Sequence, residues 1–161
     1  MTRTRVALVA IAVASAAVVV GGAWLVTGGQ ESREQPGAFV SRTVVQIVGD
    51  DYETAWDTLY APHKKVAPKD EYVACERRTP VGMTLGGVRV VRVAQSLRHV
   101  PGKAGRIPVE LVTLRLRLKD PSLGTEDAFT HTFTAVASGK GWAWILTPRK
   151  YELYRSDGCG V

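Results

Sequence analysis

Apolar positions in the first half of the chain recur with helical spacing. Between residues 52 and 60 they fall at i, i+3, i+4, i+7 and i+8, which is one buried face of a helix: Tyr52, Ala55, Trp56, Leu59 and Tyr60. Asp50 and Glu53 have the spacing of a capping box at its start, and Pro62 ends it. The pattern predicts a helix that turns Trp56 toward the sheet described next.

Two more helices are predicted on either side of this one. Residues 38–48 place four apolar side chains on one face: Val40, Val44, Ile47 and Val48. A short helix is expected from Pro68 through residue 75 or 76, because proline suits a first turn and Asp70 and Glu71 lie near the positive end of the helix dipole.

After Gly82 the period of the apolar positions changes from 3.6 toward 2, which indicates strands. Four strands are predicted, at residues 87–100, 107–119, 126–137 and 142–146. Short Gly- and Pro-containing turns separate them and favour an antiparallel meander. The alternation slips near residues 90–91 and 111–112, which is typical of bulges that bend a sheet. The predicted fold class is therefore α+β, with N-terminal helices packed on a curved four-stranded antiparallel sheet.

The second strand separates apolar from basic side chains. Its even positions from Val112 to Leu118 are apolar, whereas Arg115, Arg117 and Lys119 alternate with them. From residue 77 to 119 the chain has ten basic residues and one acidic residue, after a segment 31–76 with nine acidic and five basic residues. Such a block steers toward anionic partners, and the candidate contacts are Arg92, Arg115, Arg117 and Lys119. A solvated sheet face that keeps the domain soluble explains the same pattern.

The N-terminus contains an apolar run at residues 6–26, preceded by Arg3 and Arg5. This length can cross a bilayer, and the arginines favour a cytoplasmic N-terminus. The run predicts a membrane anchor with the folded domain outside the cell membrane; a cleaved signal peptide, which would make the protein secreted, is the alternative. Residues 27–37 have the composition of a flexible tether, and residues 38–161 are long enough for one domain.

Two cysteines, Cys75 and Cys159, lie on the outer side of this predicted span. An oxidising compartment and an even number of cysteines predict a disulfide between them. A redox-active pair would need a C-x-x-C spacing, and the three histidines offer no spacing for a metal site. No cofactor or metal is expected.

Two groups of segments support a resemblance to a known family. They are residues 51–62 (DYETAWDTLYAP) with residues 72–75 (YVAC), and residues 141–146 (GWAWIL) running on to Cys159. Together with the order of helices and meander, they resemble the nuclear-transport-factor-like, or cystatin-like cone, superfamily, in particular small secreted or membrane-anchored bacterial members. The resemblance implies a cone-shaped domain over residues 38–159, and it says little about activity because this superfold hosts isomerases, cyclases, transport factors and assembly domains.

The resemblance also implies a cavity inside the cone, which aromatic side chains could line. The candidates are Trp56, Tyr60, Tyr72, Phe129, His131, Phe133, Trp142 and Trp144. Ordinary core packing explains the same aromatic set. His131 shares its strand face with Phe129 and Phe133 and is the one weak candidate for acid–base catalysis, although a histidine on an apolar face is more often structural. The strands offer no inward carboxylate of the kind that isomerases of this superfamily use.

These observations favour a membrane-tethered interaction or accessory domain without catalytic activity, such as an assembly factor of a cell-envelope complex. The expected partners are the cytoplasmic membrane and another envelope protein or a second copy, with no specific nucleic acid. The alternative is a small-molecule isomerase, cyclase or hydrolase that uses the cone cavity.

Overall fold

The fold was analysed in a computed structural model that describes residues 34–139, 141–156 and 159. The elements are α1 (Pro36–Val48), α2 (Tyr52–Asp57), α3 (Ala61–Lys64), α4 (Lys69–Arg78), β1 (Thr84–His99), β2 (Arg106–Lys119), β3 (Glu126–Ser138), β4 (Gly141–Trp144) and α5 (Pro148–Ser156). The α+β prediction is confirmed, since helices pack on an open four-stranded antiparallel sheet with the order β1-β2-β3-β4. The predicted apolar span at residues 6–26 lies outside the described residues. Within them, none of the helices has the length and hydropathy of a membrane span.

The helical stripe at residues 52–60 is divided between two short helices. Asp51, rather than Asp50, caps α2 by accepting a hydrogen bond from the Thr54 N–H at 3.3 Å. Pro62 lies in the first turn of α3 instead of ending a longer helix. The residues between α2 and α3 leave the helix because Leu59 forms a parallel bridge with Trp144 of β4. The last two residues of the predicted tether, Pro36 and Gly37, belong to α1, and residues 27–33 of it lie outside the described residues.

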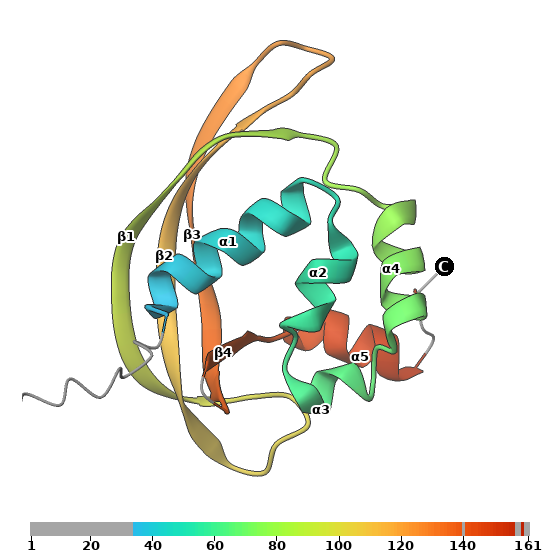
Figure 1. Cartoon of the computed structure of the whole chain (residues 1–161), viewed down its shortest axis with the longest axis vertical. Helices are drawn as coiled ribbons and strands as arrows, with labels where there is room; N and C mark the ends of the chain where they lie inside the picture. The colour runs from blue at the N-terminus through green and yellow to red at the C-terminus, as the bar shows by residue number, and fades with distance from the viewer. Residues whose placement is uncertain (1–33, 140, 157–158, 160–161) are drawn as a thin grey trace, which may run out of the picture. The chain divides into compact units, whose positions relative to one another are not determined.

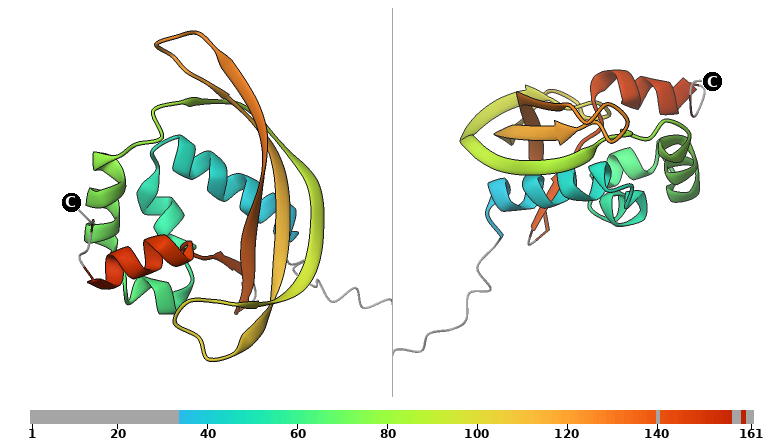
Figure 2. Two further views of the ribbon diagram at one scale, coloured as in Figure 1. Left: turned by 180° about the vertical axis from the view of Figure 1, so that it is seen from behind. Right: turned by 90° about the horizontal axis from the view of Figure 1, so that it is seen from above.

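The sheet curves around the helices, with α1 lying across its concave side (Figures 1 and 2). A register shift between Val90 and Arg92 confirms the bulge predicted in β1, and a second shift lies between Leu85 and Gly87. The bulge predicted near residues 111–112 is wrong, because the β2 pairings run through that point without a shift. The slip instead marks a change in which side of β2 is buried. Val109 packs beneath the β1–β2 turn, whereas Val112 packs against α1 on the opposite face.

The core lies in clusters on the inner side of the sheet and among the helices. The cluster between α1 and the concave face contains Phe39, Val40, Val44, Val112, Leu114, Leu116 and Ala135. A second cluster joins α2, α4 and α5 through Tyr52, Leu59, Tyr72, Leu146, Tyr151 and Tyr154. These clusters fix α1 against β2 and β3, and α5 against the other helices.

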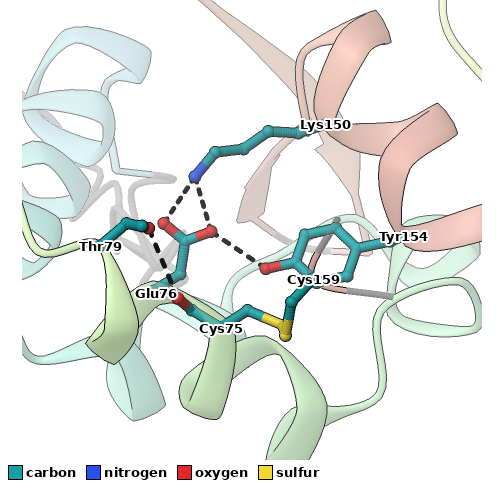
Figure 3. The surroundings of a disulfide bond; sticks show 6 residues. All are labelled: Cys75, Glu76, Thr79, Lys150, Tyr154 and Cys159. Atoms are coloured by element: carbon teal, nitrogen blue, oxygen red, sulfur yellow. Dashed lines mark hydrogen bonds and ion pairs between the residues drawn. A yellow bond between two sulfur atoms is a disulfide. The ribbon is translucent and has the colours of Figure 1, made fainter. Parts of the chain in front are cut away.

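The disulfide predicted between Cys75 and Cys159 is present, with the two Cα atoms 5.1 Å apart (Figure 3). The C-terminal segment is a helix, α5, which the strand and turn signals did not predict. Besides the disulfide, α5 is held by Glu76, which is 7% exposed and accepts hydrogen bonds from Lys150 Nζ at 2.5 and 2.6 Å and from the Tyr154 hydroxyl at 3.0 Å. Burial, together with the Glu76 charge, raises the pKa of Tyr154, so its hydroxyl stays a donor.

His63 is fully buried and joins three distant parts of the chain. Its Nδ1 accepts a hydrogen bond from the Leu146 N–H at 2.9 Å, so the ring proton lies on Nε2, which donates to the Pro101 carbonyl at 3.0 Å. Its ring also packs against Tyr60 and Tyr151. Burial lowers the pKa of His63 below its ordinary value, and the neutral imidazole therefore fastens α3 to the β1–β2 turn and to the segment that follows β4.

Candidate functional site

The sheet face that points away from α1 is strongly basic. Because residues paired across antiparallel strands share a face, the register places six cationic side chains there, which we call the basic face: Arg89, Arg92, Arg98, Arg115, Arg117 and Lys119. Glu126, which lies opposite Lys119 in the strand register, is the carboxylate that the described strands add to this face, and it forms an ion pair of 3.6 Å with Arg117. The four residues predicted from the sequence therefore lie on one face, and Arg89 and Arg98 join them.

The basic face is hollowed at two places. Arg89, Arg115 and Arg117 surround a depression of about 320 Å³ over Gly87. The Arg117 guanidinium lies over this glycine, since a Cβ on Gly87 would be 3.0 Å from its nitrogen, and it donates to the Gly86 carbonyl at 3.0 Å. A second hollow of about 410 Å³ lies between Arg92 and Arg98. Three arginines around one depression suit a multiply charged oxyanion.

The concave side of the sheet holds a separate groove between α1 and β3, made of two hollows of about 320 and 270 Å³. Both hollows are lined by Val44, Ile47, His131 and Phe133, so they adjoin at the middle of the groove. The larger one ends at Lys150 of α5, and the smaller one reaches Phe129 near the β2–β3 turn.

Two polar side chains of this groove are engaged with other parts of the protein. The Thr43 hydroxyl donates to the Phe39 carbonyl at 3.1 Å, and the Lys150 ammonium is bound by Glu76. The exposed His131 ring lies edge-on to Phe133, with 4.7 Å between ring centroids. Within the described part of the chain, no carboxylate lines either hollow and no cluster of His, Cys, Asp or Glu could hold a metal ion. His131 thus lies among groups that favour binding of an apolar ligand.

The structure divides the eight candidate pocket residues into two groups. Phe129, His131, Phe133 and Trp144 line the groove. The other four lie elsewhere: Trp56, Tyr60, Tyr72 and Trp142. Tyr72 is buried against Trp144 and Tyr154, and Trp142 donates its Nε1 hydrogen to the Glu34 carbonyl at 2.7 Å.

Trp56 does not point at the sheet as the stripe predicted. Its Nε1 hydrogen bonds to the Ala67 carbonyl at 2.8 Å, and the ammonium groups of Lys64 and Lys69 lie 4.5 and 5.5 Å from its ring centroid. The ring is half-buried against the α3–α4 connection because α2 packs mainly on α4 and α1 rather than on a strand.

Several residues that shape these sites were not found from the sequence. Arg89 has an odd residue number and Arg92 an even one, so simple alternation would place them on opposite faces of β1. The bulge at residues 90–91 puts both on one face, and a register corrected for that bulge would have assigned Arg89 to the basic face. His63 carried no signal, because its partners Pro101 and Leu146 are 38 and 83 residues away.

No protein-family model, no curated protein and no solved structure matches this chain.

Proposed function

We propose that this protein is a non-catalytic interaction domain, tethered to the outer face of the cytoplasmic membrane, whose basic face binds anionic phospholipid headgroups. The observation that carries the proposal is the register of the sheet, which gathers six cationic side chains and one carboxylate of the described strands on a single face. Each lysine or arginine near an anionic bilayer contributes about 1 kcal/mol before screening. A membrane tether would hold the domain at high local concentration near the bilayer, so weak contacts suffice.

The alternative function, catalysis in the groove, has less support. An isomerase or hydrolase that used His131 would need a second acid or base beside it; no carboxylate is among the described residues that line the hollows, and Lys150 is bound by Glu76. We also propose, from the order of its helices and strands, that the domain belongs to the cystatin-like cone superfamily. That membership is compatible with either function.

The test is cosedimentation of residues 34–161 with liposomes, after a cooperative unfolding transition has verified that this fragment folds. Binding is expected with phosphatidylglycerol vesicles at low salt, with release as salt rises. The double variant Arg115→Glu, Arg117→Glu should lose binding. Its matched control, Arg149→Glu with Arg155→Glu, makes the same change of net charge on α5 and should bind as the parent does. Equal binding to phosphatidylcholine vesicles, or equal loss in both variants, contradicts the proposal.

A further inference from the structure

One edge of β3 is open over most of its length. β3 pairs with β2 from Glu126 to Ala135, but with β4 only from Ala135 to Ser138. Along residues 126–134, no strand of the described chain lies on the side of β3 that faces β4. Such an edge presents alternating backbone N–H and C=O groups that can pair with another strand.

The pairing of β4 with β3 ends at Trp144 because the Trp144 backbone is hydrogen-bonded to other parts of the protein. The Trp144 N–H donates to the Thr58 carbonyl at 3.2 Å, and the Trp144 carbonyl accepts from the Tyr60 N–H at 2.9 Å. Two residues further along, the Leu146 N–H donates to His63 Nδ1. These bonds direct residues 145–148 away from β3 and toward α5, as the connection between β4 and α5 shows (Figures 1 and 2).

The larger hollow of the groove lies in the gap that this divergence opens. Its walls are the four consecutive β3 residues 131–134 on one side and residues 144–148 on the other. Successive strand residues point to opposite faces, so four in a row can border one space only along the edge of the strand. Val40, Val44 and Ile47 of α1 close the side toward the helices. We call this space the edge slot.

We propose that the edge slot binds an extended peptide of a partner protein by strand addition to β3. The peptide would hydrogen-bond to the open β3 edge and direct alternate side chains toward α1. Residues 144–148 line the side of the slot opposite β3, so a strand added there could not be followed by further strands, which favours a peptide over the sheet edge of a second copy. The site is distinct from the basic face, and the inference does not depend on lipid binding.

The register of β3 specifies which side chains the peptide carries. Phe133, His131, Phe129 and Asp127 succeed one another on the concave face. The peptide positions beside the three aromatic rings should therefore be apolar, and the position beside the exposed Asp127 carboxylate should be Lys or Arg. At about 3.3 Å per residue, a segment of about seven residues covers this edge. The predicted ligand is an extended segment with three alternating apolar residues and a basic residue at one end.

The first experiment is selection of random heptapeptides displayed on phage, using the full chain in a neutral detergent as bait. Enrichment of alternating apolar peptides with a terminal basic residue is expected. The winning peptide is then synthesised with alternate backbone amides N-methylated along one edge or along the other. Strand addition uses one edge only, so one version should lose roughly tenfold in affinity per blocked hydrogen bond and the other should keep its affinity. No enrichment, or equal behaviour of the two versions, overturns the proposal.

Matched variants locate the binding. Phe129 and Leu97 are both exposed strand residues, at 43% and 57%, but only Phe129 lines the groove. Phe129→Asp should abolish peptide binding while Leu97→Asp leaves it intact. Asp127→Lys should weaken a peptide that ends in Lys and restore binding when that Lys is replaced by Glu. Retained binding in Phe129→Asp, or no rescue of Asp127→Lys, shows that the peptide does not lie along the open edge of β3 and overturns the inference.

Discussion

Protonation of His63 should destabilise the domain as the pH falls below about 6.5. The neutral ring accepts from Leu146 through Nδ1 and donates to Pro101 through Nε2. A proton on Nδ1 would face the Leu146 N–H, so that two hydrogen-bond donors oppose each other, and it would place a positive charge on a side chain with no exposed surface. Because burial holds the pKa of folded His63 below the ordinary value of 6.5, the unfolded chain takes up the proton first as the pH falls.

The magnitude follows from proton linkage. The contribution of His63 is complete above pH 6.5 and is lost as the pH falls toward the pKa of the folded state. In that window the free energy of unfolding should fall by up to about 1.4 kcal/mol per pH unit, which is the value for one proton. Most carboxylates titrate below this range, so they add little to the slope.

The assay is urea unfolding of the parent protein and of two variants at several values between about pH 7 and about pH 5. His63→Gln should be less stable by about 1–3 kcal/mol at neutral pH, because a buried donor or acceptor loses its partner, but its stability should vary less with pH. His131→Gln, at the exposed histidine of the groove, is the matched control and should keep the parent's slope. If the parent and His63→Gln have the same slope, protonation of His63 is not linked to unfolding and the assignment of its tautomer is wrong.

Two further changes test the packing of the helices. Replacing both Cys75 and Cys159 by Ser should lower the free energy of unfolding by about 4 kcal/mol, as expected for a loop of this length. Urea unfolding without thiols measures the change. A near-neutral result would mean that the Glu76 contacts alone hold α5. Trp56→Ala should cost about 3 kcal/mol, the lower end for a large aromatic because the ring is half-buried, whereas Trp56→Phe should cost about 1 kcal/mol for the lost hydrogen bond to Ala67. Thermal unfolding measures both. Equal losses would assign the whole effect to the Nε1 bond and none to the packing of the ring, whereas an unchanged Trp56→Phe variant would assign no role to that bond.

The basic face was largely predictable because strand alternation is a local property. A residue's parity decides which side of a strand it occupies, so Arg115, Arg117 and Lys119 could be assigned to one face without a structure. The bulge at residues 90–91 was visible as a slip in the same pattern. The disulfide was predictable for a different reason, since two cysteines allow only one intramolecular pairing.

The groove and its edge slot depend on contacts between distant residues, which no local pattern encodes. Periodicity identified Trp56 as a member of an apolar stripe. It did not reveal that the Trp56 ring would pack beside Lys64 rather than on a strand. The slip at residues 111–112 looked like a bulge, because a strand that changes its buried side produces the same sequence as one that gains a residue.

The sequence by itself determined the four strands, the helices α1 and α4, the basic side of β2 and the disulfide, because each follows from spacing along the chain or from residue type. Only the tertiary structure decided where β4 ends and where α5 packs. The separation of β4 from β3 depends on the buried His63 ring, whose bond to Leu146 spans 83 residues. Glu76 likewise holds Lys150 across 74 residues. Such hydrogen bonds form only when the fold brings their partners together and removes water from them, so the open edge of β3 follows from packing and not from the pattern of any one segment.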